Sequence, residues 1–278
     1  MLVGYCLLGG GKRVIKATST LVPLMGVIYI SVAFILTIMH INLVPGVVGR
    51  IFAEAFDFSA IFGGFAGSCM MFGIKRGLYS NEAGVGSAPN AAAAADVSHP
   101  VKQGLVQMLS VFIDTLLICT ATAFMCLSSG IEPTKELAGA PYVQAALAAS
   151  MGDYAKLFIT VSMVLFAFTT LLGNLYYVDN AFAYVLKHVP GKTFTLCYRI
   201  LACVLIFIGA GSSMGTMWDL ADVTMGFMAI INLPVICILG GPALRALDDY
   251  TEQRDAGKNP EFKASKIGLT QKLDYWQD

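Results

Sequence analysis

Long apolar runs separated by short polar segments dominate this sequence. A helix rises about 1.5 Å per residue, so roughly 20 apolar residues cross a hydrocarbon core of about 30 Å. Runs close to that length occupy residues 21–44, 104–127, 154–185, 194–210 and 218–240. A further apolar run, 59–73, contains several glycines. The pattern predicts an all-α polytopic membrane protein with about six spans within residues 1–240 and a polar, solvated tail over 241–278.

The N-terminal stretch MLVGYCLLGG is shorter than these runs. It is apolar, but glycines end it before it is long enough to cross a bilayer. No basic segment precedes the apolar residues, as one would in a signal peptide. We therefore expect a stub, the end of a helix whose earlier part is not in this sequence.

The stretch 61–96 breaks the helical pattern. Glycines interrupt its apolar part at Gly63, Gly64 and Gly67, and a polar cluster, SNEAGVGS, follows at 80–87 before an alanine-rich helical segment. Non-helical backbone at membrane depth is tolerated only where protein buries it or a cavity lies beside it. In transporters, such broken helices hold substrate and ions. The glycines thus favour a binding site, or equally a close contact between helices.

Two sets of residues within the apolar runs are candidates for binding. Phe65 and Cys69 are four residues apart, on the face of the glycine cluster, where they line a small pocket, pack against another helix or face lipid. Thr169 and Thr170 offer two adjacent hydroxyl oxygens, which suit a hard cation such as Na⁺. Intramembrane threonines also commonly bond to carbonyls of their own helix.

Asp114 is an acidic residue near the centre of a predicted span. An acid at a helix centre costs about 2.5–3.5 kcal/mol on insertion scales, so it needs a role. An ion or proton site is one interpretation. We favour a structural hydrogen bond to the glycine-rich backbone.

Polar residues after the helix break indicate a gate. Lys75, Arg76, Asn81 and Glu82 lie together at the predicted cytoplasmic mouth. Asn81 and Glu82 either cap the next helix or pair with Arg76 to form an inner gate.

Composition and charge narrow the class of protein. The chain is 56% hydrophobic and 13% charged, against about 25% charged residues in soluble domains. The net charge is zero, which gives no basis for binding nucleic acid. The seven cysteines have no CxxC spacing, and the sequence contains no Ser-His-Asp set. We therefore expect no metal centre, no organic cofactor and no enzyme activity.

The distribution of basic residues predicts the orientation. Fifteen of the 18 Lys and Arg residues fall on the side of the loop at 12–16, and three, Arg50, Lys135 and Lys156, fall on the other. Cytoplasmic loops carry the excess of positive charge. The C-terminus is therefore predicted to be cytoplasmic.

Several segments resemble the alanine/glycine:cation symporters, also called sodium:alanine symporters. They are GGFAG at 63–67, GIKRGLYSNEAGVGSAPNAAAAA at 73–95, HPVKQG at 99–104, VFIDT at 111–115, FAFTTLLGN at 166–174 and the tail DDYTEQRDAGKNPEF at 248–262. The resemblance covers essentially the whole chain, but only the later part of the family's length.

The resemblance implies a leucine-transporter-type fold of two inverted repeats, lacking most of the first repeat. It implies Na⁺-coupled symport of small neutral amino acids, alanine and glycine, by alternating access across the inner membrane. Phe65 and Cys69 then line the substrate pocket, and Thr169 and Thr170 help to bind Na⁺. Asn174 replaces the family's usual tryptophan, which leaves the substrate range open. Expected partners are the amino acid, Na⁺ and the lipid bilayer.

Three alternatives remain open. The chain is a truncated, inactive fragment of such a transporter, or H⁺ replaces Na⁺ with Asp114 as the carrier. A membrane enzyme is the remaining class, and it would require a catalytic set that the sequence does not show.

Overall fold

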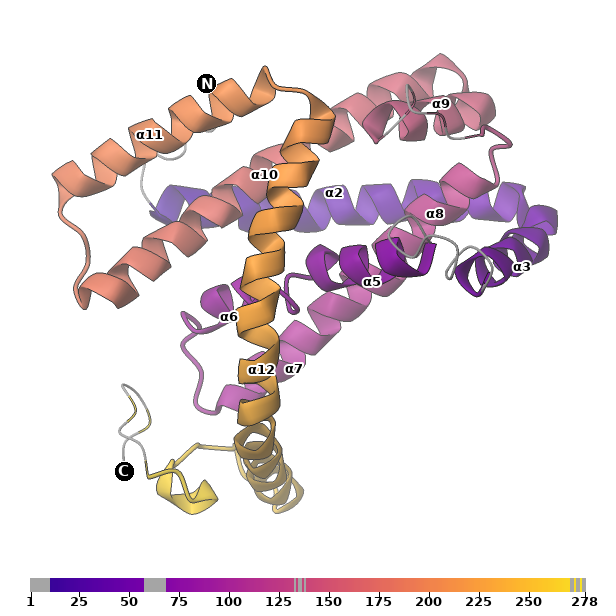
Figure 1. Cartoon of the computed structure of the whole chain (residues 1–278). Coiled ribbons are helices and arrows are strands. Elements are labelled where there is room, and N and C mark those ends of the chain that lie inside the picture. The colour runs from indigo at the N-terminus through magenta and orange to yellow at the C-terminus, as the bar shows by residue number, and fades with distance from the viewer. Residues whose placement is uncertain are drawn as a thin grey trace. The chain divides into compact units, whose positions relative to one another are not determined.

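The computed structural model describes residues 11–57, 69–132, 134, 137, 139–270, 273 and 276. Within these residues the regular elements are helices (Figure 1). They are α2 (Gly11–Met39), η1 (Ile41–Leu43), α3 (Val44–Ala55), α5 (Cys69–Ser80), α6 (Ser87–Ala92), α7 (Pro100–Val111), the π-helix η3 (Phe112–Ile118), α8 (Cys119–Leu127), α9 (Ala140–Met151), α10 (Asp153–Leu186), α11 (Lys192–Ala210), α12 (Met214–Asp255) and η4 (Ser265–Ile267). The prediction of an all-α chain is confirmed over this part.

Five helices in the described residues are long and apolar enough to cross a membrane. They are Thr18–Met39, Pro100–Leu127, Asp153–Leu186, Lys192–Ala210 and Met214–Asp255. These match the five uninterrupted apolar runs of the sequence. The glycine-interrupted run falls partly outside the described residues, so the sixth span stays a prediction. The N-terminal stub also lies outside them.

The chain divides into two compact units. One comprises residues 1–77 and 113–211, and the other comprises 78–112 and 212–278.

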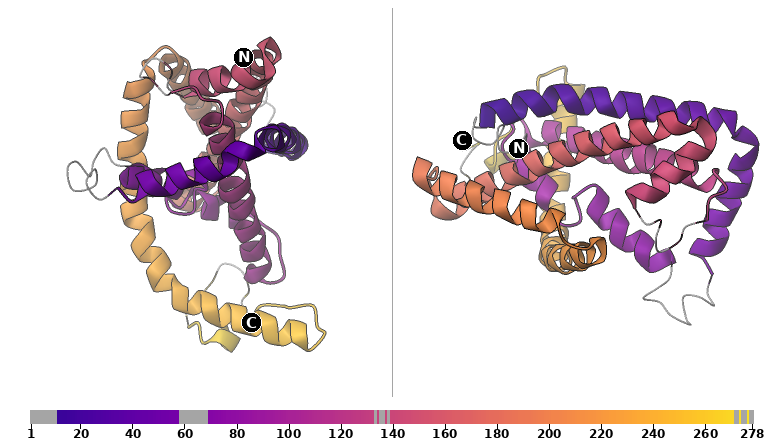
Figure 2. Two further views of the ribbon diagram at one scale, coloured as in Figure 1. Left: turned by 90° about the vertical axis from the view of Figure 1, so that its right-hand side faces the viewer. Right: turned by 90° about the horizontal axis from the view of Figure 1, so that it is seen from above.

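The core of the first unit is formed by α2, α8, α9 and α10, which run side by side in Figures 1 and 2. Alanines at the contact, Ala33 and Ala155, are fully buried. Small residues of this kind let membrane helices approach closely. Tyr29 packs edge-on against Phe166, and its hydroxyl lies 2.8 Å from Thr122 Oγ1. That hydrogen bond satisfies a polar group that would be costly to leave unpaired in an apolar core.

Helix α11 packs on the later part of α10. Leu172 and Leu175 form the buried contact, with Cys203 and Ile206 against them. An ion pair between Arg199 Nη2 and Asp179 Oδ2, at 2.8 Å, joins the same two helices.

The second unit contains a core that the sequence did not predict. Helix α12 continues fifteen residues beyond the predicted boundary at 240 and ends at Asp255. In this polar section Ala246 and Asp249 are buried on one face, spaced as successive turns of a helix require. Phe262, Ala264 and Ile267 pack against this face. The tail is therefore folded over 246–267, although most of its side chains are exposed, and its cytoplasmic location stays a prediction.

Candidate functional site

The break between α5 and α6 is the best-defined polar site in the described residues. Helix α5 ends at Ser80 and α6 begins at Ser87. Asn81 Oδ1 accepts a hydrogen bond from the amide of Ala83 at 3.1 Å. This side chain mimics a backbone turn, which is a common use of asparagine. We call residues Asn81–Gly86 the break turn.

Glu82 organises the second half of the break turn. Its backbone is left-handed, with φ of 58°. Its carboxylate accepts from Ser87 Oγ at 2.9 Å, and its carbonyl accepts from the amide of Gly86 at 3.0 Å. Glu82 thus ties itself to the first residue of α6 through its side chain, while the N-cap of α6 is Gly86, which receives no side-chain hydrogen bond.

Two glycines allow the break turn to adopt this shape. A Cβ on Gly84 would lie 2.7 Å from Leu78 Cδ2 and 2.9 Å from the Leu78 carbonyl oxygen. Gly86 has φ of 88°, and a Cβ there would lie 2.7 Å from the side chain of Asn232. Real Cβ atoms do not approach other heavy atoms so closely, and L-residues rarely adopt that φ. The polar cluster therefore needs glycine at both positions.

Helix α12 supports the break turn through a residue that the sequence reasoning missed. Asn232 Nδ2 donates hydrogen bonds to the carbonyls of Ala83, at 2.8 Å, and Gly84, at 3.0 Å. Tyr79, near the end of α5, donates to the carbonyl of Asp222 at 3.3 Å. The available signal was a lone asparagine in the apolar stretch FMAIINLPVICIL.

The two basic residues predicted for the gate lie on α5. Lys75 is half-buried, with its Nζ 5.8 Å from the centre of the Phe72 ring. Arg76, next to it, is also half-buried. The pairing of Arg76 with Glu82 stays a prediction, because these residues belong to different compact units.

The predicted substrate residues are only partly within the described structure. Gly63, Gly64, Phe65 and Gly67 lie outside the described residues. Cys69 is the first residue of α5. Its place in a substrate pocket therefore stays a prediction.

The predicted Na⁺ pair lies in the middle of α10. Thr169 is buried, and its hydroxyl donates to the carbonyls of Leu165 and Phe166 at 3.0 and 3.1 Å. Thr170 is exposed, as is Asn174 four residues later on the same face. The two hydroxyls thus point in different directions. The oxygen of Thr169 still has a lone pair that can accept or coordinate.

Asp114 lies within the π-helix η3, half-buried. A π-helical turn inside an α-helix is uncommon and occurs frequently at functional sites. The sequence marked the residue through its charge but contained no signal for the change in helix geometry. The two roles given for Asp114, an ion or proton site and a hydrogen bond to the glycine-rich backbone, stay predictions.

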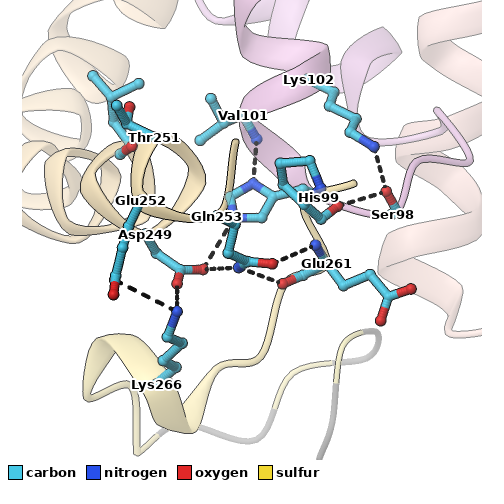
Figure 3. A network of polar contacts seen from close by, with 12 residues as sticks. Ser98, His99, Val101, Lys102, Asp249, Thr251, Glu252, Gln253, Glu261 and Lys266 are labelled. Atoms are coloured by element: carbon cyan, nitrogen blue, oxygen red, sulfur yellow. Dashed lines mark hydrogen bonds and ion pairs between the residues drawn. The ribbon is translucent and has the colours of Figure 1, made fainter. Parts of the chain in front are cut away.

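A second polar network joins the folded tail to the start of α7 (Figure 3). His99 is fully buried, and its Nδ1 accepts from the amide of Val101 at 3.2 Å, so the ring caps α7. Nε2 therefore carries the proton and donates to Asp249 Oδ2 at 3.3 Å. Lys266 forms an ion pair with the same carboxylate, which raises the pKa of the lysine.

Further bonds hold the tail against the loop before α7. Gln253 bonds both the amide and the carbonyl of Glu261, at 3.0 and 2.9 Å. Ser98 donates to the carbonyl of Pro260 at 2.9 Å, and Lys102 donates to Asn259 Oδ1 at 2.6 Å. No three metal-ligating side chains cluster anywhere in the described residues. The hydrogen bonds of Ser98, Lys102 and Gln253 clamp the tail to the loop before α7.

These features define a class: a polytopic, all-helical integral membrane protein with a polar turn built into a helix break. The family model of the sodium:alanine symporter family matches residues 1–264. The chain belongs to that family, which confirms the resemblance found in the sequence.

The relatives are named as carriers or symporters, but their names give different substrates. The chain is 42% identical over 278 residues to the amino-acid carrier protein AlsT of Bacillus subtilis, covering 100% of the chain and 59% of the relative. It is 41% identical over 273 residues to the probable sodium/glutamine symporter GlnT of the same organism, covering 98% and 56%. It is 38% identical over 291 residues to the sodium/proton-dependent alanine carrier protein of Bacillus sp. PS3, covering 100% and 65%. The chain spans less than two thirds of the length of these relatives.

Proposed function

We propose that the protein carrying this chain is a Na⁺-coupled symporter of small neutral amino acids, chiefly alanine and glycine. It works in the inner membrane by alternating access, with its C-terminus in the cytoplasm. Membership of the sodium:alanine symporter family carries the proposal. The break turn adds support. It is a non-helical segment whose polar groups are hydrogen-bonded, and transporters use such breaks in their membrane helices.

In this proposal the chain supplies the second repeat of a leucine-transporter-type fold. Phe65 and Cys69 face the substrate, with Asn174 near it, and Thr169 and Thr170 contribute oxygen atoms to the Na⁺ site. The break turn forms the inner gate. Na⁺ entry contributes roughly 2.3 kcal/mol per charge per 100 mV of membrane potential.

A competition assay tests the substrate range. Full-length protein in proteoliposomes would take up labelled alanine on an inward Na⁺ gradient, against an excess of unlabelled alanine, glycine or glutamine. We expect alanine and glycine to compete and glutamine to compete weakly, because the pocket proposed at Phe65 and Cys69 would select small side chains. Strong competition by glutamine alone would reassign the substrate to the type named for GlnT.

Proton coupling is the second candidate, favoured by Asp114 in its π-helix and by the sodium/proton-dependent relative. The discriminating variant is Asp114→Asn, which cannot carry a proton. Under the Na⁺ mechanism this variant still concentrates alanine on a Na⁺ gradient. Loss of Na⁺-driven uptake together with uptake by the parent on a proton gradient alone would favour H⁺ coupling.

A further inference from the structure

Asn232 lies within the most apolar part of α12, where a carboxamide without partners would be costly. Both of its hydrogen bonds go to the break turn, to the Ala83 and Gly84 carbonyls. Ala83 and Gly84 lie in the turn between α5 and α6, outside both helices, so their carbonyls need partners from elsewhere. Asn232 supplies these turn carbonyls with hydrogen-bond donors from up to 149 positions away in the sequence.

The contact is close as well as polar. The side chain of Asn232 occupies the space that a Cβ on Gly86 would need, at 2.7 Å. Along α12 the same face holds Asp222, Gly226 and the buried Ala229, at helical spacing. Tyr79 reaches this face at Asp222, with its hydroxyl 4.0 Å from the position of a Cβ on Gly226. The break turn thus rests on one continuous strip of α12.

We propose that Asn232 is the positioning residue of the inner gate. Its amide holds the break turn against α12 in the closed position, and the two hydrogen bonds separate and re-form in each transport cycle. The inference rests on the proposed function. It assigns to Asn232 control of the rate of gate closure rather than contact with the substrate.

The test compares three variants of the full-length protein. Asn232→Asp keeps the size but replaces the donor with a carboxylate that repels two carbonyl oxygens. Asn232→Ala removes both hydrogen bonds. Thr224→Val is the matched control on α12, because the Thr224 hydroxyl bonds only carbonyls of its own helix, those of Leu220 and Ala221.

Two readouts are measured on each variant. Na⁺-driven alanine uptake gives the maximal rate and the KM. Hydrogen exchange of the peptide covering residues 81–88, followed by mass spectrometry, reports on the break turn itself. Loss of two neutral hydrogen bonds should speed this exchange by about tenfold and lower the maximal rate by about tenfold. The KM should stay within about twofold, because no binding contact is lost.

A double variant checks the physical connection. Gly86→Ala should also release the break turn, because its Cβ overlaps Asn232. Combining it with Asn232→Ala removes the contacts at 2.7 Å with Cγ and Oδ1 and leaves Cβ at 3.2 Å and the positive φ. The effect of the double variant on exchange should therefore be smaller than the sum of the two single effects.

The outcomes separate the inference from the proposed function. A parent protein that transports no small amino acid refutes the proposed function. A parent that transports, with Asn232 variants unchanged in both rate and exchange, refutes the inference alone. A raised KM at unchanged maximal rate also overturns it, since that pattern belongs to a substrate-binding residue.

Discussion

Gly84 shows how one residue fixes the shape of the break turn. An added Cβ would meet the Leu78 carbonyl oxygen at 2.9 Å, and a backbone atom cannot swing aside as a side chain can. We expect Gly84→Ala to destabilise the protein by about 1–3 kcal/mol. Thermal unfolding in detergent measures the effect. Gly77→Ala is the control, because a Cβ there meets nothing within 4 Å, and alanine favours a helix. Equal melting temperatures for the two variants would contradict the geometry.

His99 makes stability depend on pH. Burial lowers its pKa below the ordinary value of about 6.5, and Lys102 and Lys266 lower it further, while Asp249 opposes the shift. Protonation would also end the bond that Nδ1 accepts from Val101. Below about pH 6.5 the unfolded chain therefore binds more protons than the folded one. The stabilisation is present above that pH and is lost as the pH falls.

The measurement for His99 is the melting temperature between about pH 7.5 and pH 5.5. We expect the parent protein to lose stability as the pH falls. His99→Asn, which can cap a helix but does not titrate in this range, should show a flatter profile. A parent profile as flat as that of the variant would show that the ring is not held neutral.

At this scale the sequence predicted part of the site. Asn81 and Glu82 were identifiable as turn residues, because such side chains bond groups a few positions away, and their role in a gate stays a prediction. Asn232 was not identifiable, because its hydrogen-bond partners lie far away in the sequence and no local pattern predicts such a contact. The sequence also could not show that Thr169 is buried and Thr170 exposed, because the two are identical neighbouring residues.

At the scale of elements, hydropathy located the spans well and their ends poorly. The five uninterrupted runs became five long helices, because in a bilayer the backbone must bond within its own segment. The predicted span ends at 240, whereas helix α12 continues to Asp255. Hydropathy falls at 240, but the helical spacing of Ala246, Asp249 and Gln253 continues beyond it. The π-helix at Asp114 left no trace in the pattern.

The folded tail can be tested as an element. Phe262 is buried against His99, with ring centres 5.2 Å apart. Phe262→Ala should lower stability by about 3 kcal/mol or more through the cavity it leaves. Lys263→Ala, at the exposed neighbouring position, should have little effect. Similar melting temperatures for both variants would show that the tail is solvated, as the sequence first indicated.

At the scale of the whole molecule, the sequence segments around the break indicated the family before any geometry was available, and the family model then confirmed it. The repeat architecture and the Na⁺ site stay proposals. They depend on long-range packing and on residues such as Phe65 that lie outside the described structure. The orientation in the membrane also stays a prediction, which rests on the distribution of Lys and Arg along the sequence.

The central claim is coupling between Na⁺ and a small neutral amino acid. The most direct measurement is the ratio of internal to external labelled alanine in proteoliposomes holding the full-length protein, with and without an inward Na⁺ gradient. We predict accumulation above the external concentration while the Na⁺ gradient lasts, and equilibration when an ionophore removes it. Accumulation that is unchanged when the gradient is removed would contradict the account.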